Sequence, residues 1–227
     1  GINAEYGEQQ MSCCKDTQRQ QLDTWFSAIQ GRNMPVVQAM LHECARQTEQ
    51  RKFAVVRAEQ DFQVTAPGFS GLMYAILLND LDLFNLLLKE EAEVTCAQDV
   101  FIPLRQKSQI RQQIMLDNAA ERTFSKLNVQ NFVFIPRGSS ALETCVYLSR
   151  FGLFKELITS TLKSPDIKSL FNTNSLYEST LMIISQNLEL FKHFLPHARI
   201  FVKQLNFENQ MGKTVCSPLQ RRKMRSS

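Results

Sequence analysis

The chain is poor in the residues that make tight turns. It has only 8 Gly and 7 Pro among 227 residues, which disfavours an all-β protein built from many short hairpins. It also lacks any apolar run approaching the roughly 20 residues that a helix needs to cross a membrane. Its hydrophobic content of 44% is ordinary for a globular protein. We therefore expect a helical, globular protein that makes no use of a membrane.

The cysteines lack any metal-binding or disulfide pattern. Six of them lie at positions 13, 14, 44, 96, 145 and 216, and no two have the C-x-x-C spacing typical of zinc or redox sites. The sequence also lacks an N-x-S/T glycosylation site. We therefore expect free thiols in a reducing compartment, which is the cytoplasm or, alternatively, the nucleus.

Catalytic motifs are absent as well. The chain has no G-x-x-x-x-G-K-[ST], G-x-G-x-x-G or G-x-S-x-G sequence, and residues 212–214 match only the end of the first of these. His193 and His197 have the spacing of two metal ligands on a helix, but Pro196 lies between them and no H-E-x-x-H glutamate is present. We expect a protein without catalytic residues, metal or cofactor that acts on no small-molecule substrate.

The charge of the chain is only mildly positive, with a formal net charge of +4 at pH 7. The excess comes from a short basic tail at 220–227, which contains Arg221, Arg222, Lys223 and Arg225. Such a tail is typical of a nuclear-targeting or acid-binding segment. A solvated chain end is the alternative explanation.

The clearest pattern in the chain covers residues 68–94. Residues 72–78 form a short apolar helix pattern, and Asn79-Asp80 then offers polar side chains that can cap a second helix from Leu81 to about Glu90. Neither helix is long enough to be stable alone. Each also has more apolar surface than its partner can cover, so the pair needs similar pairs on both sides.

This stretch resembles an ankyrin repeat, whose pattern is roughly G-x-T-P-L-H-L-A-A-x-x-G-H-L-E-I-V-K-L-L-L-x-x-G-A-D-V-N. The matching positions are Gly68, Ser70, Leu72, Ala75-Ile76, residues 81–84, Leu86-Leu87-Leu88 and residues 92–94. Three residues depart from the pattern. Gly71 stands in place of the proline, Met73 in place of the histidine and Glu91 in place of the late glycine.

The spacing of this stretch recurs along the chain. Nine residues separate the members of three apolar pairs, which are Trp25 and Met34, Leu72 and Leu81, and Leu142 and Phe151. A fourth pair, Leu181 and Leu188, is two residues closer. The resemblance thus gives copies near 22–48, 68–95, 138–163 and 177–196, with a partial copy from 205.

The segment 96–137 fits this scheme least well. The interval of 70 residues between positions 68 and 138 is close to two repeats of about 33 residues. The segment is therefore either a diverged repeat or an insertion, with a helical pattern near 108–120 and a short apolar run at 132–135. Before the second copy, residues 52–57 fit either a helix extension or a strand.

The resulting prediction is an all-α fold, an α-solenoid of about four or five degenerate ankyrin-type helical hairpins. The predicted domain covers residues 16–219, after a flexible segment at 1–15. The resemblance implies a non-catalytic scaffold that binds a protein partner on a concave face. Two alternatives stay open: a helical-repeat protein that binds nucleic acid, and a regulatory or targeting region of a larger enzyme.

The resemblance also indicates which residues touch the partner. In this family the variable contact positions are the residue after the glycine and the two after the pair of small residues. Together with Arg137, they are Phe69, Leu77, Leu78, Ser139, Tyr147 and Leu148. Their apolar character has two explanations, since either a partner covers them or the 96–137 segment buries them internally.

We expect no strong, salt-sensitive binding to nucleic acid. The basic residues of the middle segment are dispersed, and Asp117 and Glu121 lie among them, so few counterions would be released on binding. The residues concerned are Arg105, Lys107, Arg111, Arg122 and Lys126. Titration with single- and double-stranded oligonucleotides at physiological salt tests this expectation. Submicromolar binding would favour the nucleic-acid alternative.

Overall fold

The computed structural model describes residues 2–57, 62–103, 114–115, 132–163, 173–176, 178–185 and 187–194. In these residues the fold is mostly helical, with eight helices and five short strands. Within the described helices, none is both long enough and apolar enough to cross a membrane. The predicted partial copy from 205 and the basic tail at 220–227 lie outside the described residues.

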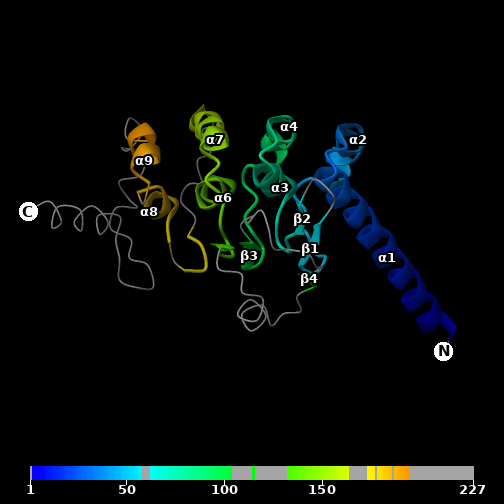
Figure 1. Cartoon of the computed structure of the whole chain (residues 1–227). Coiled ribbons are helices and arrows are strands. Elements are labelled where there is room, and N and C mark those ends of the chain that lie inside the picture. Colours follow the sequence, from blue (N-terminus) through cyan, green and yellow to red (C-terminus); the bar gives the residue numbers. More distant parts are fainter. Residues whose placement is uncertain are drawn as a thin grey trace, which may run out of the picture.

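The helices form four antiparallel pairs that lie in a row (Figure 1). The pairs are α1 (Ile2–Gln30) with α2 (Met34–Cys44), α3 (Gly71–Leu78) with α4 (Leu81–Glu91), α6 (Ala141–Tyr147) with α7 (Phe151–Lys163), and α8 (Thr180–Ser185) with α9 (Leu188–Phe194). The first helices contact one another in the order α1, α3, α6 and α8, and the second helices α2, α4 and α7 do likewise. The paired helices and their spacing agree with the sequence-based prediction, including the shorter link between α8 and α9.

The helix α1 is longer than predicted. It begins at Ile2, so the helix includes most of the segment 1–15 that the sequence pattern placed in a flexible end. Residues 2–30 contain no proline and are rich in glutamine, which favours helix. The N-terminal part of α1 projects beyond the row of helix pairs (Figure 1).

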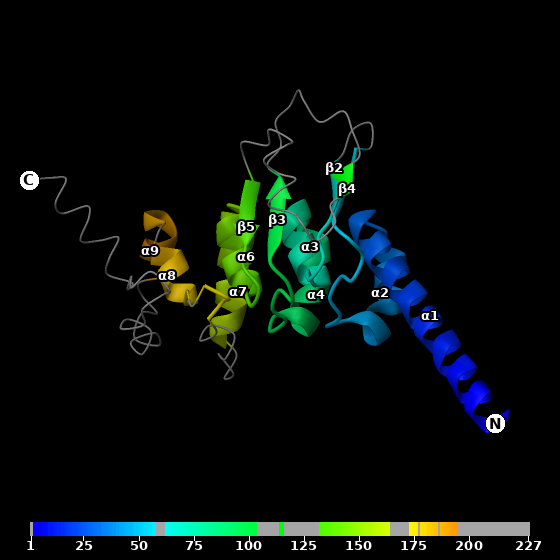
Figure 2. The same ribbon diagram turned by 90° about the horizontal axis from the view of Figure 1, so that it is seen from below.

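Short strands between the helix pairs correct the all-α prediction. They are β1 (Ala54–Arg57), β2 (Phe62–Thr65), β3 (Val100–Pro103), β4 (Ile114–Met115) and β5 (Phe132–Ile135). The first strand pairs antiparallel with β2 on one side and with β4 on the other, while β3 pairs antiparallel with β5 (Figure 2). These segments are rich in valine, isoleucine and phenylalanine, which pack well on a pleated surface. The strand β4 also replaces part of the helix predicted near 108–120.

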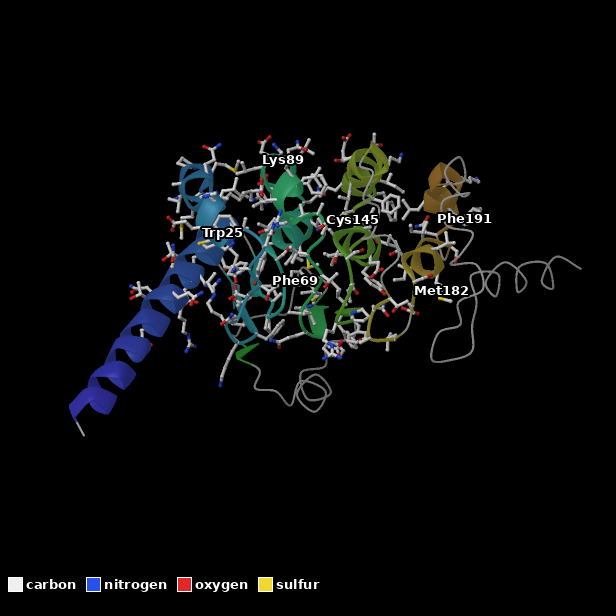
Figure 3. The ribbon with its side chains drawn as sticks, turned by 180° about the vertical axis from the view of Figure 1, so that it is seen from behind. Trp25, Phe69, Lys89, Cys145, Met182 and Phe191 are labelled. Atoms are coloured by element: carbon white, nitrogen blue, oxygen red, sulfur yellow. The ribbon has the colours of Figure 1, made fainter. Side chains whose placement is uncertain are left out.

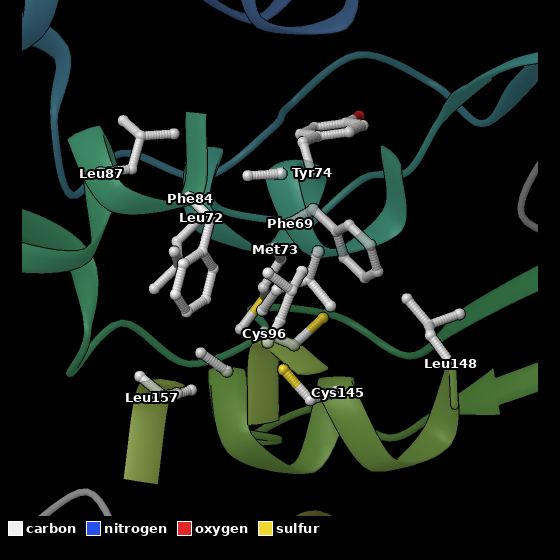
Figure 4. Close-up of a cluster of buried hydrophobic side chains, with 14 of the residues drawn as sticks. Phe69, Leu72, Met73, Tyr74, Phe84, Leu87, Cys96, Cys145, Leu148 and Leu157 are labelled. Atoms are coloured by element: carbon white, nitrogen blue, oxygen red, sulfur yellow. The ribbon is translucent and has the colours of Figure 1, made fainter. Parts of the chain in front are cut away.

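One apolar core runs through all four pairs. Figure 3 labels one buried side chain from each successive pair or the turn before it: Trp25, Phe69, Cys145 and Met182. On α1 the side chains of Trp25, Phe26 and Ile29 belong to this core and are 0% exposed. Between the second and third pairs, Met73 and Phe84 face Cys145 and Leu157 (Figure 4).

Two leucines of α4 differ in how far they are buried. Leu87 is 0% exposed and Leu81 is 51% exposed. We expect Leu87→Ala to lower the free energy of unfolding by about 2–5 kcal/mol, because it leaves a cavity between helix pairs. The matched variant Leu81→Ala should cost less than about 1 kcal/mol. Chemical denaturation measures both, and equal losses would contradict this assignment of the buried face.

Candidate partner-binding surface

The loops before the second and third helix pairs each join the next pair through two backbone hydrogen bonds. The N–H of Glu49 donates to the carbonyl of Phe69, and the carbonyl of Glu49 accepts from the N–H of Gly68, both at 2.8 Å. The same exchange recurs at Cys96, whose N–H donates to Ser139 at 2.8 Å and whose carbonyl accepts from Gly138 at 2.8 Å. This repeated exchange fixes the start of the second and third pairs in the same way.

The glycine of this turn is required by its backbone. Gly68 has a φ of +90° and Gly138 a φ of +85°, a region that other residues rarely adopt. At Gly68 an added Cβ would also lie 2.6 Å from the backbone nitrogen of Gln98. The neighbouring loops can therefore approach this closely only because the position has no side chain.

A serine then starts the first helix of three pairs. The Oγ atoms of Ser70, Ser140 and Ser179 accept from backbone N–H groups three residues later, each at 3.3 Å. These bonds satisfy N–H groups that have no partner inside the helix. The positions of Ser70 and Ser140, which the sequence pattern matched to the repeat threonine, are thus helix caps.

Glu91 supplies a second cap to α3 from the end of α4. Its side chain is 0% exposed, and its carboxylate accepts from the N–H of Leu72 at 2.7 Å and from the N–H of Arg46 at 3.1 Å. Burial raises the pKa of Glu91, and these N–H donors partly oppose the rise. A Cβ added at Gly71 would lie 3.1 Å from this carboxylate, so the glycine leaves room for it.

The structure corrects three of the seven predicted contact residues. Phe69 and Ser139 are 0% exposed and Leu148 is 8% exposed, so they do not face a partner. The ring of Phe69 packs edge-on against Tyr74, with centroids 5.6 Å apart (Figure 4). The loop bonds hold the residue after each glycine toward the core, which is the physical reason for the burial of Phe69 and Ser139. 

The internal explanation is supported for Phe69 and Leu148, which belong to the apolar core. Four described residues of the 96–137 segment belong to the same buried cluster, namely Cys96, Val100, Ile102 and Ile135.

The other four predicted residues keep some exposure. Leu77, Leu78 and Tyr147 are half-buried, and Arg137 is exposed. The Tyr147 hydroxyl donates to Glu178 at 3.2 Å and accepts from the amide of Asn174 at 3.2 Å. Because α3 contacts α6, the structure brings the half-buried residues of these two helices onto adjoining elements.

Two arginines hold the end of α3 beside these residues. The guanidinium of Arg150 donates to the carbonyls of Ile76 at 3.3 Å and Leu77 at 3.1 Å. From the other side, Arg32 donates to the carbonyl of Leu78 at 3.3 Å. A cation is favoured at a helix C-terminus, where carbonyl groups have no partner inside the helix. Nothing in the sequence pattern indicated this role, because it joins three different helix pairs.

Exposed apolar residues repeat along another part of the row. Leu81, Phe151 and Leu188 are 51%, 37% and 40% exposed, and each is the first residue of the second helix of its pair. The sequence pattern placed them at repeat-defining positions, and periodicity alone did not indicate their exposure.

The two-stranded sheet of β3 and β5 has two apolar faces. On one face, Val100, Ile102 and Ile135 are buried against the helices. On the other face, Phe101 lies 4.7 Å from Phe134 and 5.4 Å from Phe132 between ring centroids, and Phe132 is 43% exposed. The strand β5 also contacts α6. The aromatic group therefore lies on the face of this sheet opposite to the one buried against the helices.

Comparison of the chain with protein-family models and with curated proteins found no match. Among the described residues, no group of three or more His, Cys, Asp or Glu side chains could hold a metal ion.

Arg150, which donates to two carbonyls at the end of α3, links the second and third helix pairs. We expect Arg150→Met to lower the free energy of unfolding by about 1–3 kcal/mol, because two carbonyls lose a charged donor. Arg150→Lys should recover only part of this loss, since an ammonium group lacks the planar fork of a guanidinium. The exposed Arg19→Met on α1 is the matched control, measured by the same denaturation. An Arg150→Met variant as stable as that control would rule out the link.

Proposed function

We propose that this chain is a degenerate ankyrin-type solenoid that binds a protein partner without catalysing a reaction. The observation that carries the proposal is the repeated turn. Gly68 and Gly138 lie 70 residues apart, yet they share a positive φ, the same exchange of two backbone bonds, and a serine cap two residues later. Such repetition is typical of proteins built from stacked repeats.

The buried ionisable groups support a structural role over a catalytic one. Glu49 pairs with Arg51 at 2.7 Å and accepts from the Tyr74 hydroxyl at 3.2 Å. Glu91 and Glu143 accept from backbone N–H groups at helix starts. Each of these carboxyl groups therefore has bonds that hold the fold, and none is needed to explain a reaction.

The proposed binding surface, named here the inner surface, consists of Leu77, Leu78, Arg137, Tyr147 and Phe132. These residues come from the first helices, the turn before α6 and the β5 strand, which lie on the side of the row away from the second helices (Figure 1). Aromatic residues and arginine are enriched at the centre of protein interfaces. The inner surface therefore has the composition of a protein-binding site, in keeping with the concave face used by the family that the chain resembles.

A photo-crosslinking experiment tests this proposal. A benzophenone amino acid replaces Arg137 on the inner surface in one variant and the exposed Lys155 of α7 in the control. After irradiation in native lysate, we expect a discrete protein adduct from position 137 that position 155 does not give. Because both positions are exposed, neither replacement should change the melting temperature by more than a few degrees.

A charge substitution provides the second part of the test. Leu78→Glu should reduce the yield of the position-137 adduct at least tenfold, since it places a carboxylate in an apolar contact. Leu81→Glu, which lies outside the inner surface, should leave the yield unchanged. Equal adducts from positions 137 and 155, or a yield that Leu78→Glu does not alter in a folded variant, would contradict the proposal.

A further inference from the structure

Two carboxyl groups lie at the junction between the third and fourth helix pairs. Glu143 of α6 is 0% exposed, and Glu178, just before α8, is half-buried. None of the ion pairs between described residues includes either of them. This junction therefore differs from the first one, where the buried Glu49 is paired with Arg51.

Hydrogen bonds from both helix pairs converge on Glu143. One carboxyl oxygen accepts from the N–H of Ser140 at 3.2 Å and completes a capping box at the start of α6. The other accepts from the hydroxyl of Thr180 at 2.7 Å. Because Thr180 is the first residue of α8, this one carboxyl group joins the starts of two neighbouring helices.

The surroundings offer little compensation for a negative charge. The elements packed against α6 are α3, α7, α8 and β5. Neither α8 nor β5 has an ionisable side chain, the described charged groups of α7 are exposed, and Tyr74 of α3 bonds to Glu49. 

The two remaining charged groups near Glu143 do not stabilise its ionised form. The Tyr147 hydroxyl donates to Glu178, so this second carboxylate faces the junction. Arg150, the cation next along the chain, donates to carbonyls of α3.

We propose that Glu143 is a pH-sensitive latch, in which the neutral carboxyl group holds α8 and α9 against α6 and its ionisation weakens that docking. The neutral carboxyl group can accept from the N–H of Ser140 and donate its own proton to the hydroxyl of Thr180. The ionised form leaves a charge in an unexposed site that faces Glu178 and lacks a described cationic partner.

The direction of the pH dependence follows from the proton balance. Burial raises the pKa of Glu143 to about 8, from an ordinary value of 4.5; the hydrogen bonds from Thr180 and Ser140 partly oppose this rise, and Glu178 adds to it. Between pH 4.5 and about pH 8, the docked state therefore holds a proton on Glu143 that the undocked state has released. Docking is strongest below about pH 4.5, weakens as the pH rises, and levels off above about pH 8. The docking constant falls by up to tenfold per pH unit inside this window.

Hydrogen exchange measures this docking directly. Protection factors for the amides of α8 and α9, corrected for the intrinsic rate, are followed from pH 5.5 to 8.5 in the whole chain. We expect these protection factors to fall by up to tenfold per pH unit. The amides of residues 22–29 in α1 serve as the internal reference. In Glu143→Gln the carboxamide carbonyl can accept from Ser140 and its NH₂ group can donate to Thr180, so the slope should disappear.

Two controls make the result decisive. Glu156→Gln removes an exposed carboxylate from α7 and should keep the slope of the original protein. Carbon-13 NMR of the Glu143 carboxyl group in the unchanged protein needs no variant, and it should show titration near neutral pH. Titration of Glu143 near its ordinary value, or the same slope with and without Glu143→Gln, would overturn the latch.

Discussion

The stacking of the first three helix pairs depends on one backbone constraint, the two hydrogen bonds that a connecting loop exchanges with the turn before the second pair and again before the third. These bonds form only where the turn residue adopts a positive φ and has no side chain, as at Gly68 and Gly138. They turn the following residue into the core and place a serine at the start of the helix. The spacing of the helix pairs then follows, because each pair begins at a fixed distance from the preceding loop.

Both ends of α3 are capped by side chains from outside that helix. Gly71 stands where the repeat pattern has proline, and Glu91 stands where it has glycine. The first position is therefore smaller than in the pattern and the second is larger. The space at Gly71 admits the Glu91 carboxylate, which caps α3. At the other end of the same helix, Arg32 and Arg150 cap the carbonyls from two neighbouring pairs. Both ends of α3 are therefore satisfied by residues outside it, which binds three pairs into one unit.

The junctions differ in how they hold buried charge. At the first junction Glu49 is neutralised by Arg51, which also donates to Ser27 at 2.9 Å, so α1 and the following loop are joined by a balanced network. At the last described junction Glu143 and Glu178 face one another without such a partner among the described residues. A junction whose buried carboxylate is paired with a cation is stable over a wide pH range. A junction whose buried carboxyl group has no such partner has a stability that depends on whether that group is protonated.

The sequence by itself determined the features that depend on local pattern. Apolar periodicity and capping residues located the helix pairs and the shortened link before α9, because each of these is set within a few residues of chain. Only the tertiary structure decided the rest. The pairing of β3 with β5 joins segments about 30 residues apart, and the burial of Phe69, Ser139 and Leu148 depends on neighbouring loops. The caps from Glu91 and Arg150 likewise join residues that are distant in the sequence. The periodicity of a sequence does not indicate which distant groups come into contact.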